Sequence, residues 1–162
     1  MLIAITIITT GLLFSCGGGD DDAKGGTLTI DSEGVKGTIE AGEYKKSNKL
    51  HYGKQDAWVI GYGTSELAII PTDKTLADLT KNIESENSFG SKKIEFQDET
   101  TVLVKEVRLD FKTKEVKEEG YSFLMVIDGF MFKGTGENPL MPIKDKAEAE
   151  KLIKIAKTFK KS

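Results

Sequence analysis

Short runs of β-branched and aromatic residues, separated by turn residues, recur along most of this chain and limit it to a sheet-rich fold. The first run alternates polar and apolar residues, with Leu28 and Ile30 on one face, which is typical of a half-buried strand. The run at 121–127 is almost entirely apolar, which is typical of a central strand. Glycine-containing turns at 61–65 and 128–129 predict hairpins. Strands are therefore expected at 27–31, 35–40, 57–62, 66–70, 92–97, 101–111, 121–127 and 130–133.

Two segments carry the apolar spacing of helices instead. Within 75–85 apolar residues recur at three- and four-residue intervals, and Thr75 with Asp78 forms a weak capping-box pattern. Within 145–160 a second apolar stripe follows Asp145, and we expect it to cover the sheet rather than lie on a membrane. The order of these elements predicts an α+β domain. Its expected form is an antiparallel twisted sheet of about six to eight strands packed with two main helices, one of them C-terminal.

Two polar stretches are expected to be connections rather than regular structure. Residues 41–56 have no long apolar period, so they predict a long loop with a short strand at 49–52. Residues 113–120 are mostly charged and predict a turn.

The segment 1–15 is uncharged and apolar, which is typical of the central part of a secretory signal and too short for a spanning helix. Cys16, the only cysteine, follows Leu13, Phe14 and Ser15 directly. This order resembles the lipobox of bacterial lipoproteins. The resemblance implies cleavage before Cys16, acylation of Cys16 with chains such as palmitate, and a membrane anchor. The alternative is a small buried cysteine in an apolar segment.

The tract after Cys16 contains three glycines and then three aspartates at 20–22, so we expect a flexible, hydrated tether over 16–26. Its composition resembles the tether of Bacteroidota-type lipoproteins. That resemblance implies an outer-membrane location, facing either the periplasm or the cell surface. The remaining chain, 27–162, is expected to be one domain. The chain has 23 basic and 26 acidic residues, and the three tether aspartates account for the difference. A neutral body gives no electrostatic case for nucleic-acid binding.

The layout of the body resembles the PsbP-like and DcrB-like group of lumenal and periplasmic proteins. In that group a helix follows the early strands, and an aromatic-rich hairpin leads into a final helix. The corresponding segments here are 75–85, 121–133 and 145–160. The resemblance implies a non-enzymatic accessory, assembly or binding protein.

Residues that could carry catalysis are few. His51 is the only histidine, Ser65 lies outside a nucleophile elbow, and Cys16 would be consumed by the lipid. The glycine pairs at 61–63 and 134–136 do not complete a phosphate-binding motif, so turns explain them better. With one histidine and one cysteine, the common zinc sites are excluded, and we expect no metal and no cofactor. A carboxylate pair could still support a small envelope hydrolase.

Aromatic residues offer a second kind of site. Tyr44, Tyr52, Trp58 and Tyr62 cluster in sequence around the predicted loop, and such side chains can bury apolar area while keeping a polar tip. They are candidate partner-binding residues for a protein or a glycan, and ordinary core packing is the alternative. The sequence therefore predicts a lipid-anchored extracytoplasmic binding or envelope accessory module that is not an enzyme, with a small envelope hydrolase as the alternative.

Overall fold

The computed structural model describes residues 25–52 and 55–162, so the predicted signal, Cys16 and nearly all of the predicted tether lie outside the described residues. The described chain forms two helices, α1 (Leu76–Thr80) and α2 (Lys146–Ala156), and the strands of two sheets. The strands are β1 (Thr27–Ser32), β2 (Val35–Glu40), β3 (Lys46–Tyr52), β4 (Gln55–Gly61), β5 (Ser65–Pro71), β6 (Ser85–Asn87), β7 (Gly90–Gln97), β8 (Thr101–Leu109), β9 (Val116–Ile127), β10 (Phe130–Gly136) and β11 (Lys160–Lys161).

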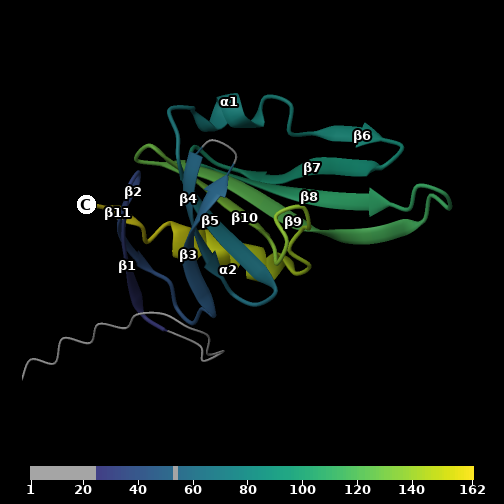
Figure 1. The fold of residues 1–162 in the computed structure, drawn as a ribbon. Coiled ribbons are helices and arrows are strands. Elements are labelled where there is room, and N and C mark those ends of the chain that lie inside the picture. The colour runs from purple at the N-terminus through teal and green to yellow at the C-terminus, as the bar shows by residue number, and fades with distance from the viewer. Residues whose placement is uncertain (1–24, 53–54) are drawn as a thin grey trace, which may run out of the picture.

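Every strand pairing among these residues is antiparallel. The larger sheet has eight strands in the order β3-β4-β5-β10-β9-β8-β7-β6, and the smaller has three in the order β1-β2-β11 (Figure 1). The predicted α+β class is confirmed, and the larger sheet lies within the predicted number of strands. The sequence does not predict the smaller sheet. In it β1 and β2 pair with each other outside the larger sheet. The helix predicted over 145–160 ends at Ala156, and Lys160 and Lys161 add β11 by pairing with Thr38 and Gly37 of β2.

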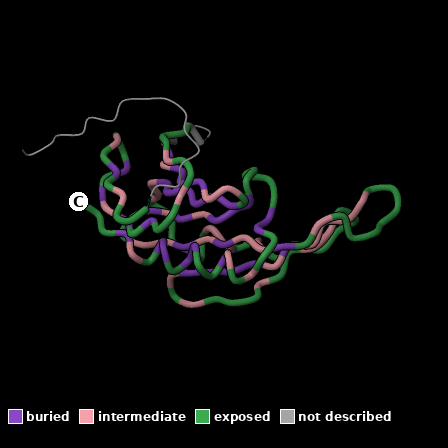
Figure 2. Tube along the Cα trace, turned by 90° about the horizontal axis from the view of Figure 1, so that it is seen from below, coloured by how far each residue is buried: buried purple, intermediate pink, exposed green. Residues whose placement is uncertain are grey.

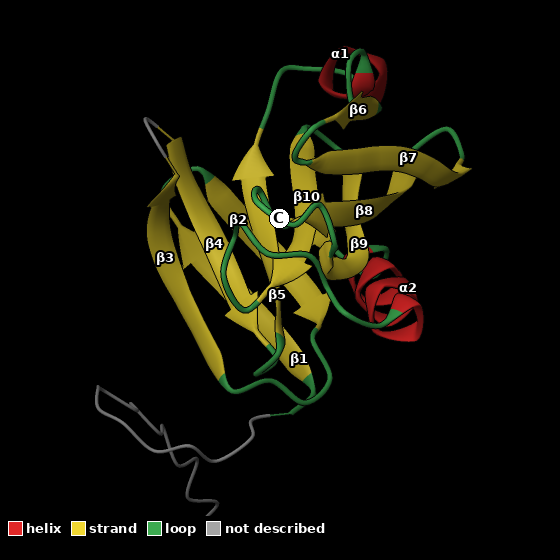
Figure 3. Cartoon of the chain, turned by 90° about the vertical axis from the view of Figure 1, so that its right-hand side faces the viewer, coloured by secondary structure: helices red, strands yellow, loops and turns green. Residues whose placement is uncertain are grey.

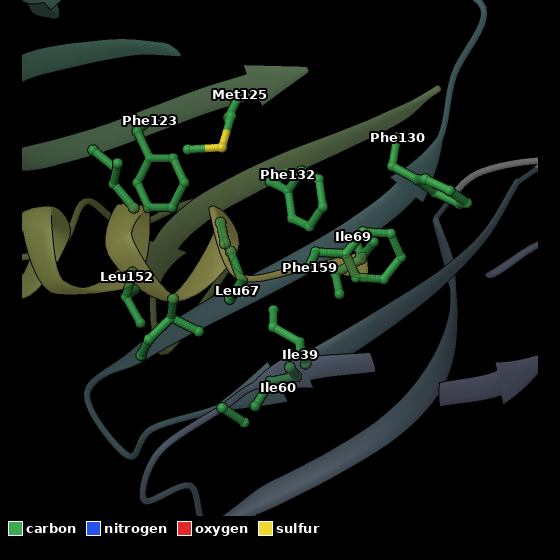
Figure 4. Packing of buried hydrophobic residues seen from close by; sticks show 14 of the residues in the cluster. Ile39, Ile60, Leu67, Ile69, Phe123, Met125, Phe130, Phe132, Leu152 and Phe159 are labelled. Atoms are coloured by element: carbon green, nitrogen blue, oxygen red, sulfur yellow. The ribbon is translucent and has the colours of Figure 1, made fainter. Parts of the chain in front are cut away.

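One buried cluster contains residues of both sheets and of α2 (Figure 4). Phe123, Phe132 and Leu67 come from the larger sheet, Ile39 comes from the smaller sheet, and Leu152 comes from α2. Each of these five side chains is at most 1% exposed. The cluster therefore joins the early strands and the last helix of the chain in a single core.

The short segment after α2 contributes an aromatic ring to this core. Phe159 contacts Phe130 and Phe132 edge to face, with ring centroids 5.2 Å and 5.3 Å away. Such pairs contribute about 0.5–1.5 kcal/mol beyond the area that they bury. The C-terminal segment is thus part of the folded domain and not an appendage.

The central strands are buried on both faces. On β5, Leu67 and Ile69 belong to the main cluster, whereas Ala68 and Ile70 belong to a second cluster on the other side. On β8, Val102 and Val104 belong to a third cluster together with Leu76 of α1. These strands therefore have nearly continuous apolar sequences, because neither face of a central strand meets water.

The first predicted helix is shorter than its apolar spacing indicates. The capping box is present, because the hydroxyl of Thr75 accepts from the Asp78 amide and the Asp78 carboxylate accepts from the Thr75 amide. The helix nevertheless ends at Thr80, and residues 85–87 pair with β7 as β6. The predicted helix over 75–85 is therefore wrong beyond Thr80. Cross-strand pairing with β7 overrides the local helical pattern there.

The two predicted polar connections are only partly correct, because the short strand expected at 49–52 lies within β3 and most of the remaining residues also form strands. Residues 46–52 and 55–61 form the β3–β4 pair, which a 2.7 Å ion pair between Lys49 and Asp56 bridges. Strand β9 begins at Val116, and its charged half pairs with β8 through a 2.6 Å contact of Lys105 with Glu119. Strand β3 is an edge of the larger sheet, and the charged half of β9 pairs with β8 but not with β10. Both segments therefore carry charged side chains and lack the apolar alternation that marks a strand.

Candidate functional site

Three of the four predicted binding aromatics lie partly buried against the main core. These are Tyr44, Trp58 and Tyr62, whereas the side chain of Tyr52 lies outside the described residues, although its backbone ends β3. The indole nitrogen of Trp58 donates to Ser47 Oγ over 2.7 Å. Packing and local hydrogen bonding thus occupy much of the Trp58 surface.

Tyr62 connects β4 to the chain that follows β2. Its hydroxyl donates to the backbone carbonyl of Ala41 over 3.0 Å. Burial, reinforced by the nearby carboxylate of Glu148 and by Tyr44, raises the pKa of Tyr62 well above its ordinary value. The phenol is therefore a neutral hydrogen-bond donor at any physiological pH, and it cannot act as a general base.

Tyr44 and Tyr62 also line one part of a groove. Two hollows of about 610 Å³ and 250 Å³ both include Thr64, in the turn between β4 and β5, and Glu148 in α2. The larger hollow continues along the end of β10 and the connection into α2, and the smaller one reaches Tyr44. We call the two hollows together the hairpin groove. Its volume suits a short peptide or a few sugar rings.

The hairpin groove is rich in carboxylates, most of which are already engaged. Glu148 accepts from Ser65 Oγ over 2.7 Å, and Asp145 accepts from the Ala147 amide as the N-cap of α2. Glu118 lies 3.6 Å from Arg108. Glu43 and Glu137 complete the group, and the lysines of the groove are Lys45, Lys144 and Lys151.

The hydroxyl of Ser65 is hydrogen-bonded to the carboxylate of Glu148, as a nucleophile is to a base. The likeness ends with this hydrogen bond. Ser65 is 1% exposed, so its oxygen cannot reach a substrate in the groove. The pair joins the start of β5 to the first turn of α2. Its role is to hold the two sides of the groove together.

Other predicted catalytic or ligating residues can be placed only in part. Cys16 and the side chain of His51 lie outside the described residues. Within the described ranges, no group of three or more histidine, cysteine, aspartate or glutamate side chains could hold a metal ion. In that same part of the chain, no helix is both long and apolar enough to cross a bilayer.

A second exposed feature lies at the far end of the larger sheet and could not be predicted from the sequence. Strands β6 to β9 extend as an arm whose end is exposed (Figure 2), and Figure 3 views the sheet from that end. Phe89 and Phe111 lie in the two turns of the arm and are 60% and 65% exposed. Their rings stack with centroids 5.7 Å apart and an angle of 14°. Val116 is 60% exposed at the start of β9, and we call these three residues the aromatic tip.

Comparisons with protein-family models, with curated proteins and with solved structures find no match to this chain.

Proposed function

We propose that this protein is a lipid-anchored extracytoplasmic binding or envelope accessory module and not an enzyme. Cys16 is the proposed acylated residue, 16–26 the tether, and 27–162 the domain, a twisted sheet packed with two helices. The lipobox-like order before Cys16 and the Gly/Asp tract after it support an outer-membrane anchor. Two or three acyl chains on one cysteine are enough for stable attachment, because each buried methylene contributes about 0.8 kcal/mol.

The hairpin groove is the observation that carries the binding role. It combines two tyrosine rings with carboxylates and lysines in two hollows that share Thr64 and Glu148. Tyrosine side chains present an apolar face and a polar tip, which suits both peptides and sugar rings. The proposed occupant is therefore a segment of a protein partner or a glycan of the envelope.

A Cys16→Ala variant tests the anchor. We expect it to lose all incorporation of an alkyne-bearing fatty acid in cells, because the thiol is the only proposed attachment point. Incorporation is read by click labelling and gel fluorescence, with Ser15→Ala as the matched control, since a small residue is kept before the cysteine. Labelling of the Cys16→Ala chain at the wild-type level would contradict the anchor.

A Thr64→Arg variant tests the groove. Thr64 is exposed and lines both hollows, so a long side chain there should block binding without disturbing the core. We expect binding to glycan and peptide arrays to fall by tenfold or more, roughly 1.4 kcal/mol. The control is Thr29→Arg, at an exposed position on β1. Equal binding by both variants would show that the groove is not the site.

A small envelope hydrolase that uses a carboxylate pair is the second candidate function. The four carboxylates of the larger hollow, from Glu118, Glu137, Asp145 and Glu148, favour it. The engagement of three of them in an ion pair, a helix cap and a serine hydrogen bond favours the binding role instead. Release of shortened sugars from a glycan bound in the array, abolished by Glu137→Gln, would decide for the hydrolase.

A further inference from the structure

The aromatic tip is held so that its rings stay in solvent. Gly90 adopts φ +142°, and a Cβ at this position would lie 1.9 Å from the carbonyl oxygen of Val107. This close approach brings the two turns of the arm together. Lys114 then ties them, because its amine donates to the Ser88 carbonyl over 3.2 Å and lies 5.0 Å from the centroid of the Phe111 ring. The rings are thus presented outward by a fixed backbone.

A lone apolar tip in water needs a partner that can cover it. Three side chains of this size bury far less than the roughly 1,200 Å² of total area that a stable protein complex requires, so a second copy of the chain does not suffice. The segment 111–117 carries three lysines and one glutamate. Aromatic rings flanked by lysines suit the boundary between lipid headgroups and acyl chains, where long lysine stems carry their amines back to the headgroups.

The acidic residue at the start of this turn keeps its charge. The carboxylate of Asp110 accepts from the amides of Thr113 and Lys112, at 2.9 Å and 2.8 Å. These backbone hydrogen bonds lower the pKa of Asp110, so the carboxylate stays ionised. With Asp110 counted, residues 110–117 contain three lysines and two acidic residues, so the turn keeps a net positive charge of one.

We propose that the aromatic tip inserts into the interfacial region of a lipid bilayer as a second attachment point. The inference rests on the proposed anchor at Cys16. The tip and the small sheet that contains β1 lie at opposite ends of the molecule (Figures 1 and 2). The nine residues from Cys16 to Gly25 span at most about 30 Å, so attachment at both ends lays the body along the membrane. Stable membrane binding by weak elements commonly requires two such signals.

The test places a tryptophan at the tip of the full chain in vesicles. The vesicles contain phosphatidylcholine and phosphatidylglycerol, with part of the phosphatidylcholine brominated on its acyl chains. We expect the fluorescence of Phe111→Trp to be quenched above the wild-type baseline. That baseline comes from Trp58, the only tryptophan, which packs against the core. Phe96→Trp, at a 48% exposed site on β7 outside the tip, is the matched control and should stay at baseline.

Removing the second ring should reverse the effect. Phe89→Ser in the Phe111→Trp chain is expected to lower the ratio of inserted to free tip about tenfold or more, since one of the two apolar rings is no longer buried in the bilayer. Vesicle flotation separates the two proposals. A chain that floats through Cys16 without quenching at position 111 keeps the anchor and overturns the tip inference, leaving the tip to a protein partner. Equal quenching at positions 96 and 111 overturns it as well, and a chain that does not float overturns both proposals.

Discussion

Removal of residues 145–162 is expected to abolish cooperative unfolding of the chain. The deletion takes away α2 and β11, and with them Leu152, Ala156 and Phe159 from the main cluster. It also leaves the outer edge of β2 unpaired. Phe123 and Phe132, now at most 1% exposed, would face water. Thermal unfolding followed by circular dichroism of the full and shortened chains measures the loss.

The matched control for this deletion is Lys154→Ala, on the exposed side of α2. It should melt like the wild type, because surface substitutions usually change stability by less than about 0.5 kcal/mol. A shortened chain that keeps a sharp melting transition would show that the sheets hold together without the helix.

Phe132→Ala is expected to lower the free energy of unfolding by about 3–5 kcal/mol. The ring is 0% exposed, contacts Phe159 edge to face, and lies in the main cluster that both sheets and α2 share. Its removal loses the transfer free energy of the ring and leaves a cavity that a core tied to so many elements cannot easily close. Urea unfolding at equilibrium gives the difference.

Phe96→Ala is the control, because it removes the same ring from a 48% exposed position. We expect it to cost clearly less than Phe132→Ala. If the two variants lost equal stability, burial in the main cluster would not be what makes Phe132 important.

Local pattern was sufficient for the parts of the fold that bury a continuous face. The strand at 121–127, the hairpin at 128–129 and the helix after Asp145 are all present because their apolar residues meet the core. The capping box of Thr75 and Asp78 depends only on residues three apart, and it too is present. Sequence periodicity indicates the local spacing of apolar residues and the one face that they bury.

The elements that the sequence did not predict, or predicted only in part, are those that depend on distant partners. Strand β11 exists only because β2 offers an edge, and β6 only because β7 does. Strand β3 has no apolar face of its own and is fixed by its pairing with β4. None of these three segments has the alternating apolar pattern of a strand. Its strand structure is therefore determined by tertiary pairing alone.

The candidate sites also divide into features that residue type alone indicates and features that depend on distant partners. Tyr44 and Tyr62 could be named because tyrosine has a dual character wherever it occurs, but their place in a groove depends on how α2 approaches the β4–β5 turn. Phe89 and Phe111 lie 22 positions apart, and their stacking depends on the register that pairs Gly90 with Arg108. Register is a property of two strands together, so neither turn alone indicates the pair.

The position of β1 determines how the domain responds to mechanical load. Force that enters at Gly25 reaches β1 at the pair of Thr27 with Glu40 and opens the β1–β2 ladder one pair at a time. Strand β2 stays held by β11 from its other side. Since Ile30 is the one fully buried side chain of β1, this strand can peel away under tension while most of the interior keeps its packing.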